Sequence, residues 1–153
     1  FFNVFGGGQD PKSPYSGVLS IFCDRYINRD RITVFGDGEQ TRDFIHISDV
    51  IRALVASLTY LETRPAAENA SIFNVCSGRQ TSLNAILNLL EVVGGYTADI
   101  VHVAERAGDM RASCGDPAKM NAELGFHAEV SLADGLQELI HFLDAPQYTA
   151  KLG

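Results

Sequence analysis

Two arginines in this sequence stand in polar loops where they could bind a phosphate group. Arg42 follows a tight turn at residues 36–38 and opens a short apolar stretch. Arg106 and Asp109 bracket Gly108 in a second loop. A guanidinium grips phosphate through parallel hydrogen bonds, and a carboxylate accepts hydrogen bonds from ribose hydroxyls. These residue types together predict a nucleotide site.

An ordinary structural role stays open for both loops. Arg106 could close a solvated turn through a salt bridge to Asp109. Arg42 could form an exposed ion pair with one of the carboxylates close to it in the sequence, which are Asp37, Glu39 and Asp43. Exposed ion pairs are common and contribute little to stability, so spacing alone does not separate them from a ligand site.

The other candidate groups give weaker signals. The glycines at 6–8 resemble part of a phosphate loop, but Pro11 stands where the dinucleotide-binding pattern needs glycine. His46 could act as a general base, although a single histidine on a strand is more often a packed structural residue. The remaining histidines and the three cysteines lack the spacing of metal ligands, so no metal site is expected.

Composition narrows the classes of partner. The chain has 153 residues, 46% of them hydrophobic, and a formal net charge of −7. That charge argues against a surface for nucleic acid or for an anionic membrane, since both need a clustered positive field. An anionic ligand must then be met by local arginines, which make up nine of the 12 basic residues. Without a disulfide pattern, a signal peptide or an apolar run of membrane length, a cytoplasmic protein is expected.

Hydrophobic periodicity predicts alternating strands and helices, which is typical of the α/β class. Strands are expected over residues 1–5, 31–35, 43–47, 71–75 and 100–103, and helices over 15–28, 50–58, 83–93, 117–124 and 132–143. Ser48 or Asp49 is expected to cap the second helix, and Thr81 or Ser82 the third. An α/β sheet usually has more parallel strands than these, and the chain starts abruptly on a strand, so a truncated fold is expected.

Seven phrases occur in an order that carries a family resemblance. They are residues 2–6 (FNVFG), 8–11 (GQDP), 13–18 (SPYSGV), 33–44 (TVFGDGEQTRDF), 73–75 (FNV), 106–109 (RAGD) and 124–126 (LGF). In this order they resemble the extended short-chain dehydrogenase/reductase family, specifically NAD-dependent epimerases and dehydratases of the UDP-glucose 4-epimerase-like branch. The resemblance covers nearly the whole chain.

The resemblance implies the C-terminal part of a Rossmann-like enzyme. Residues 1–153 would hold its last Rossmann strands and helices, interleaved with the small mixed α/β substrate-binding domain. The N-terminal NAD-binding half, with its G-x-x-G-x-x-G loop and its Y-x-x-x-K pair, would be absent. None of the five tyrosines has a lysine four positions later, so no catalytic residue is assigned to this chain.

The resemblance also implies roles for particular residues. Arg42 and Arg106 would bind the diphosphate of a UDP-sugar, and Asp109 would bind the ribose. Asn3 would contact the phosphate or the sugar. The uracil pocket would be lined by Val18, Thr33 and Phe35, and the nicotinamide ring of NAD would be contacted by Phe1, Phe2 and Val4. Family patterns differ at Gly7, Cys76 and Ala104, which leaves the substrate detail open.

The leading hypothesis is that the parent enzyme is an NAD-dependent 4-epimerase of a UDP-hexose, and that this chain supplies substrate recognition. A nucleotide-sugar dehydratase or decarboxylase of the same family is one alternative, because such enzymes share the arginines. A non-catalytic nucleotide-sugar-binding fragment is another. The expected partners are a UDP-sugar and, for the parent, a second copy in a homodimer.

Overall fold

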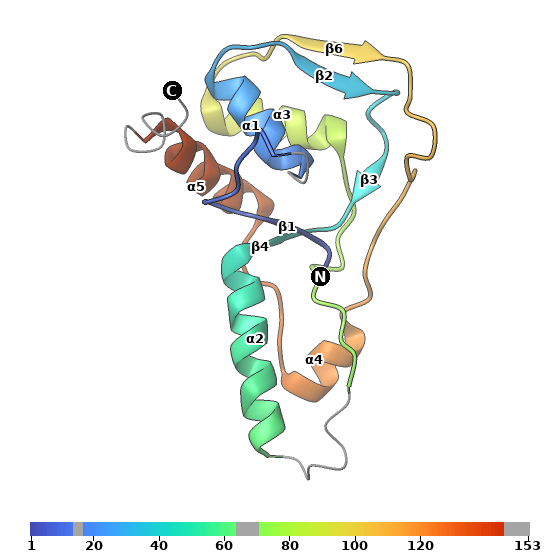
Figure 1. Ribbon diagram of the computed structural model, residues 1–153, viewed down its shortest axis with the longest axis vertical. Helices are drawn as coiled ribbons and strands as arrows, with labels where there is room; N and C mark the ends of the chain where they lie inside the picture. Colours follow the sequence, from blue (N-terminus) through green and yellow to red (C-terminus); the bar gives the residue numbers. More distant parts are fainter. Residues whose placement is uncertain (14–16, 64–70, 146–153) are drawn as a thin grey trace.

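The computed structural model describes residues 1–13, 17–63 and 71–145, and within them strands and helices alternate (Figure 1). The strands are β1 (Asn3–Phe5), β2 (Ile32–Phe35), β3 (Thr41–Arg42), β4 (Phe44–His46), β5 (Thr81–Ser82) and β6 (Ile100–Val103). The helices are α1 (Val18–Ile27), α2 (Ile47–Glu62), α3 (Leu83–Gly94), α4 (Ala118–Leu124) and α5 (Leu132–Asp144). The expected α/β class is confirmed.

The strands of the described residues form three pairs. β1 and β4 are parallel, with Asn3 opposite Phe44, and β2 and β6 are parallel, with Ile32 opposite Ile100. The short β3 is antiparallel to β5. Figure 1 shows β2 and β6 at one end of the molecule, β1 and β4 in the middle, and α2 and α4 at the other end.

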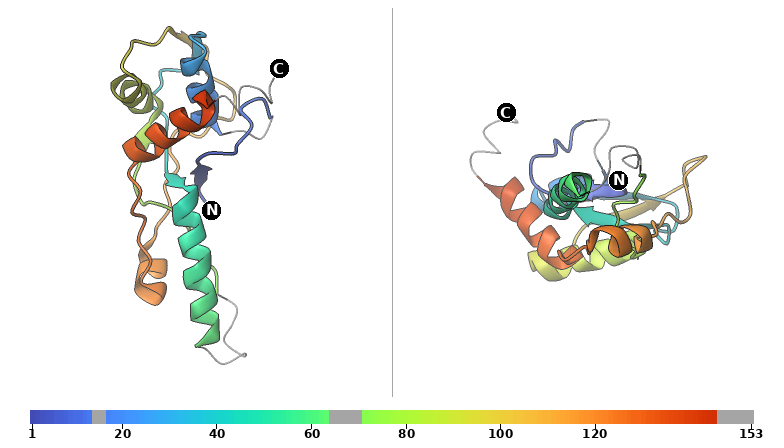
Figure 2. Two further views of the ribbon diagram at one scale, coloured as in Figure 1. Left: turned by 90° about the vertical axis from the view of Figure 1, so that its left-hand side faces the viewer. Right: turned by 90° about the horizontal axis from the view of Figure 1, so that it is seen from below.

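The main hydrophobic core lies between α1, α3, α5 and the strands β2 and β4. Each helix contributes a stripe at helical spacing, because residues three or four apart share one face. In α3 the stripe consists of Leu83, Ile86, Leu87 and Leu90. A smaller core joins β4 to α2 and α4, whose side-by-side arrangement is visible in both views of Figure 2. It contains Ile45, Val50, Ala53, Val75, Met120 and Phe126.

Local capping explains where α3 begins and ends. The Ser82 hydroxyl accepts a hydrogen bond from the Ala85 N–H at 3.2 Å, and Gly95 ends the helix with a left-handed φ of 78°. The Ser82 cap matches the sequence prediction, and a glycine ends the helix because it adopts a positive φ without strain.

The predicted caps of α2 were wrong. His46 is the N-cap, and its Nδ1 accepts a hydrogen bond from the Ser48 N–H at 3.4 Å. Asp49 lies inside the helix because its buried carboxylate has other partners. It pairs with Arg52 and accepts hydrogen bonds from the backbone that leads into α5. His46 therefore has a structural role, which is the more common role of a single histidine on a strand.

The strand expected at residues 71–75 was also wrong. The structure describes this segment without a strand, although the Phe2 N–H donates to the Val75 carbonyl at 3.0 Å. Ile72 is 87% exposed, and its carbonyl accepts a hydrogen bond from Lys119 Nζ instead of from a neighbouring strand. A β-branched apolar sequence alone does not form a strand without a neighbouring strand to pair with. Residues 15 and 16, part of the expected first helix, lie outside the described residues.

One face of α2 is apolar and exposed. Its large side chains recur every three or four residues and are Ile47, Ile51, Leu54, Val55 and Leu58. Because these side chains are exposed, the face contacts solvent and not another described element.

No helix among the described residues is long and apolar enough to cross a membrane.

Candidate functional site

A buried carboxylate fixes the backbone around Arg42. Asp43 is fully buried, and its Oδ1 accepts hydrogen bonds from the Ser77 N–H at 2.9 Å and the Ser77 hydroxyl at 2.7 Å. Its Oδ2 accepts from the N–H groups of Gly78 at 2.9 Å and Gly115 at 3.2 Å. One side chain thus joins three segments that are distant in sequence, and it holds the junction of β3 and β4 in place.

A second set of backbone bonds brings the loop that carries Arg106 beside Arg42. The Thr41 N–H donates to the Arg111 carbonyl at 2.9 Å, and the Ser113 N–H donates to the Thr41 carbonyl at 3.1 Å. At the other end of the loop, the Gly36 N–H donates to the Val103 carbonyl at 2.9 Å. The loop from residue 104 to 110 is therefore anchored at both ends, against the turn at 36–38 and against β3.

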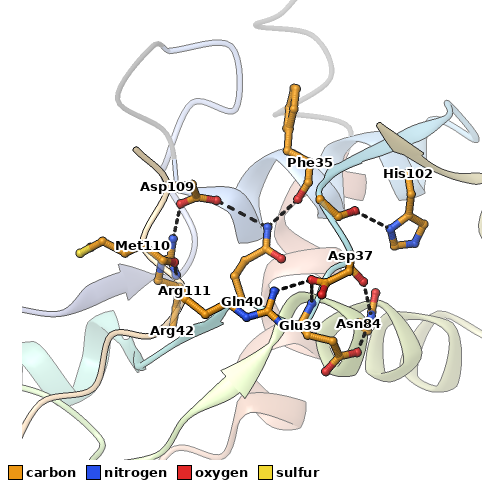
Figure 3. A network of polar contacts seen from close by, with 11 residues as sticks. Phe35, Asp37, Glu39, Gln40, Arg42, Asn84, His102, Asp109, Met110 and Arg111 are labelled. Atoms are coloured by element: carbon orange, nitrogen blue, oxygen red, sulfur yellow. Dashed lines mark hydrogen bonds and ion pairs between the residues drawn. The ribbon is translucent and has the colours of Figure 1, made fainter. Parts of the chain in front are cut away.

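Arg42 binds this loop directly. Its Nη2 donates to Asp109 Oδ1 at 2.5 Å, and its Nη1 donates to the carbonyls of Met110 at 2.6 Å and Thr41 at 2.8 Å (Figure 3). The Arg42 side chain is only 15% exposed, and that of Asp109 is 36% exposed. The carboxylates close to Arg42 in the sequence do not take part in these bonds. The fold instead brings Asp109, which is distant in the sequence, next to Arg42.

A cavity of about 680 Å³ lies between α1, β2 and the 106–109 loop. Six of the seven residues that the resemblance assigned to the substrate line it, and they are Val18, Thr33, Phe35, Arg42, Arg106 and Asp109. The volume is within the range of small-molecule sites. Apolar side chains of α1 and β2 thus line the same cavity as the guanidinium groups of Arg42 and Arg106 and the carboxylate of Asp109.

Arg106 differs from Arg42 in its partners. Its guanidinium carbon lies 3.7 Å from the centroid of the Phe35 ring, which is the geometry of a cation–π contact. Within the part of the chain that the structure describes, its guanidinium donates no hydrogen bond to protein. The predicted salt bridge between Arg106 and Asp109 does not form, since Asp109 pairs with Arg42. The donors of Arg106 are therefore available to a ligand.

Gln40 is a pocket residue that the sequence analysis missed. Its side chain is buried, and its Nε2 donates to the Phe35 carbonyl at 2.7 Å and lies 3.5 Å from Asp109 Oδ2. The available signal was its spacing, because residues two apart on an extended segment point to the same side, and Arg42 follows two positions later. Arg25 and Arg31 also line the cavity, and each forms an exposed ion pair, with Asp30 and Asp99 respectively.

A polar network supports the turn beneath the pocket (Figure 3). Asp37 Oδ1 accepts from Arg111 Nη1 at 2.6 Å and from the Glu39 N–H at 2.9 Å. The hydrogen bond from Arg111 is the largest cause that lowers the pKa of Asp37 to about 2. Asn84 at the start of α3 donates to the Asp37 carbonyl at 2.9 Å and to Glu39 Oε1 at 2.6 Å. Gly38, with φ of 78°, leaves no room for a Cβ against the Asn84 amide.

The residues predicted on β1 lie elsewhere. Asn3 does not line the cavity, and its Nδ2 donates to the Asp43 carbonyl at 2.7 Å. Phe1 is 72% exposed, Phe2 lies against Gly115, and Val4 packs partly into the smaller core. The apolar groups of Phe1 and Phe2 could contact a ring of a cofactor, but they offer nothing that would bind its phosphates. No group of three potential metal ligands occurs among the described residues.

Comparison with known proteins finds sequence and structural relatives of this chain. The family model for the NAD dependent epimerase/dehydratase family matches residues 1–76. A putative UDP-glucose 4-epimerase of Methanocaldococcus jannaschii is 29% identical over 143 residues, which are 94% of this chain and 44% of that protein. The chain is thus similar to the NAD-dependent epimerase/dehydratase family, whose model matches its residues 1–76.

Solved structures of relatives extend the likeness to the whole described fold. A UDP-glucose 4-epimerase of Thermotoga maritima, solved with UDP-glucose, is 32% identical with a TM-score of 0.80, over 99% of this chain and 45% of that one. A UDP-glucuronic acid 4-epimerase of Bacillus cereus, solved with UDP-glucuronic acid and NAD, gives 28% and 0.79, over 99% and 44%. The fold is therefore Rossmann-like, as predicted. This chain spans less than half the length of each of these relatives.

The relatives that this chain matches have names that are not limited to epimerases. Curated relatives of 28 to 29% identity include dTDP-glucose 4,6-dehydratases and a UDP-N-acetyl-alpha-D-glucosaminuronate decarboxylase. Sugar-nucleotide modification is thus common to these relatives, while the reaction differs among them.

Proposed function

We propose that this chain is the nucleotide-sugar-binding part of an NAD-dependent sugar-nucleotide 4-epimerase and that it binds a UDP-hexose in the cavity beside β2. Residues 1–153 would form the C-terminal part of that enzyme, with the NAD-binding half in a separate part of the polypeptide. The observation that carries the proposal is the convergence of Arg42, Arg106 and Asp109 on one cavity.

Each group suits a different part of the ligand. The guanidinium of Arg106, stacked on Phe35, would donate charge-assisted hydrogen bonds to the diphosphate together with Arg42. Asp109 would accept hydrogen bonds from the ribose hydroxyls. The apolar surfaces of Val18 and Phe35, with Thr33 between them in sequence, would contact the uracil. Two arginines at the cavity, of which Arg42 is partly shielded from solvent, would allow a chain of net charge −7 to bind an anion.

The chain would contribute binding and orientation rather than proton transfer. Among the described residues, no tyrosine or histidine lines the cavity, and its carboxylate, Asp109, is paired with Arg42. His46 serves as the N-cap of α2. When bound, NAD would supply the chemistry by taking a hydride from the sugar and returning it. Phe1, Phe2, Val4 and Asn3 would reach the sugar or the nicotinamide from β1. A cytoplasmic location and a homodimeric parent belong to the same proposal and rest on the sequence.

The proposal predicts that Arg42→Ala weakens UDP binding. Loss of one charge-assisted hydrogen-bonding group costs about 1.5 to 3 kcal/mol, or roughly a 10- to 150-fold higher Kd. Isothermal titration calorimetry of this chain with UDP measures the change. Arg79→Ala is the matched control, because Arg79 is exposed and lies outside the cavity.

Equal UDP affinity in wild type and Arg42→Ala would remove Arg42 from the site. The same titration with NAD is expected to show no saturable binding, and saturation would contradict the placement of NAD outside this chain. A dehydratase or decarboxylase would share the cavity, so the reaction is separated by product analysis of the longer enzyme. A C4 epimer supports the proposal, and a keto-deoxy sugar or a decarboxylated sugar supports the alternative.

A further inference from the structure

Arg42 is already engaged before any ligand arrives. It directs three hydrogen bonds at protein acceptors, of which two are backbone carbonyls and the third is the Asp109 carboxylate. We propose that Asp109 makes diphosphate binding at Arg42 conditional on a ribose hydroxyl, so that the cavity selects nucleoside diphosphates over free diphosphate. This inference rests on the proposed function and adds a determinant of specificity to it.

The contact between Arg42 and Asp109 opposes a diphosphate that arrives alone. The carboxylate lies 2.5 Å from Arg42 Nη2 in a partly shielded position, so the guanidinium charge is largely neutralised. A diphosphate would have to displace this carboxylate or bind beside it, against the repulsion of like charges. Either route lowers the affinity for an anion that offers Asp109 nothing in exchange.

A nucleoside diphosphate offers that exchange. Ribose hydroxyls donate hydrogen bonds to a carboxylate, and this replaces the bond that Asp109 loses when Arg42 turns to the phosphates. Gln40 Nε2 lies 3.5 Å from Asp109 Oδ2, the oxygen that does not contact Arg42. This amide is itself held at the Phe35 carbonyl at 2.7 Å, so the carboxylate keeps a neighbouring donor after it releases Arg42.

The conformation of the 104–110 loop allows Asp109 to move from Arg42 to a ribose hydroxyl. Its two ends are held by backbone bonds at Val103 and Arg111, while between them Gly108 has φ of 83° and no atoms within 4 Å of a Cβ position. Asp109 follows this glycine directly and can shift without moving the anchored ends. Arg106 stacks on Phe35 and pairs with no carboxylate among the described residues. One arginine is therefore always available to phosphate, and the other only conditionally.

The test compares three ligands on wild type and on Asp109→Asn. Isothermal titration calorimetry is performed with pyrophosphate, uridine and UDP. In Asp109→Asn, pyrophosphate affinity is expected to rise about tenfold, because the competing charge is gone, while uridine affinity falls. The advantage of UDP over pyrophosphate therefore shrinks in the variant. Glu129→Gln is the matched control, since it removes the same charge from an Arg–carboxylate pair of 2.8 Å with Arg52 outside the cavity and should leave pyrophosphate affinity unchanged.

The outcomes separate this inference from the proposed function. Wild-type binding of UDP together with unchanged or weaker pyrophosphate binding in Asp109→Asn overturns the inference and leaves the nucleotide site intact. Wild-type binding of pyrophosphate as tight as that of UDP also overturns it. A wild type that binds none of the three ligands overturns the proposed function and the inference with it. Matching circular dichroism spectra show that each variant is folded.

Discussion

Asp43→Asn is the substitution with the largest effect expected on the stability of the site. The side chain is fully buried and accepts hydrogen bonds from Ser77, Gly78 and Gly115. An asparagine has nearly the same shape, so the packing volume is kept. The substitution removes the negative charge and replaces one acceptor oxygen with an N–H donor group.

The cost follows from the atoms that lose a partner. If the amide oxygen takes the position of Oδ1, both bonds from Ser77 survive. The amide nitrogen then faces the N–H groups of Gly78 and Gly115, neither of which can donate to it. The Gly115 N–H is buried, and a buried donor left without an acceptor costs about 1 to 3 kcal/mol. The Gly78 N–H is only part-buried and adds less, so the free energy of unfolding should fall by about 1 to 4 kcal/mol.

Urea unfolding followed by far-UV circular dichroism measures this loss through the linear dependence of free energy on urea. Asp37→Asn is the control, because that carboxylate and its partner Arg111 are both exposed, so a much smaller change is expected. A decrease below about 1 kcal/mol for Asp43→Asn would refute the argument that its oxygens hold the three segments together.

Two further predictions concern ionisable groups. Asp37 is expected to titrate at about 2 in an NMR pH series, and its stabilising effect should be present above the ordinary value of 3.8 and be lost as the pH falls towards 2. Arg111→Gln should return this pKa towards 3.8, and an unchanged low value would exclude Arg111 as the cause. Burial raises the pKa of Cys23 to about 12 and that of Cys76 to about 11, so both should resist iodoacetamide near pH 8 in the native state. Cys114 is exposed and should be alkylated first; peptide mass spectrometry showing early modification of Cys23 would contradict its place in the core.

Local features of the fold were predictable from sequence. The stripe of α3, its Ser82 cap and its Gly95 end follow from side-chain spacing and from backbone sterics, which act within a few residues. The N-cap of α2 was not predictable from sequence. Asp49 lies inside the helix because its carboxylate accepts hydrogen bonds from the backbone of residues 129 and 130. No local rule anticipates a contact across that separation.

The candidate site shows the same division. The residue types of Arg42, Arg106 and Asp109 indicated binding of phosphate and ribose. The family resemblance assigned all three to one ligand. The direct contact between Arg42 and Asp109 spans 67 positions and depends on the backbone bonds that lay the loop beside β3. Gln40 had only its spacing from Arg42 to mark it. Asn3 was grouped with the pocket but contacts the backbone of Asp43 instead.

Asn84 illustrates how ligand preference can be adjusted from a distance. Its amide binds the Asp37 carbonyl and Glu39, and Asp37 in turn binds Arg111 at the end of the loop that carries Asp109. A change at Asn84 therefore alters the support of that loop while every residue lining the cavity keeps its identity. Substitutions at Asn84, which does not line the cavity, are therefore a route by which evolution could change the ligand preference of this chain.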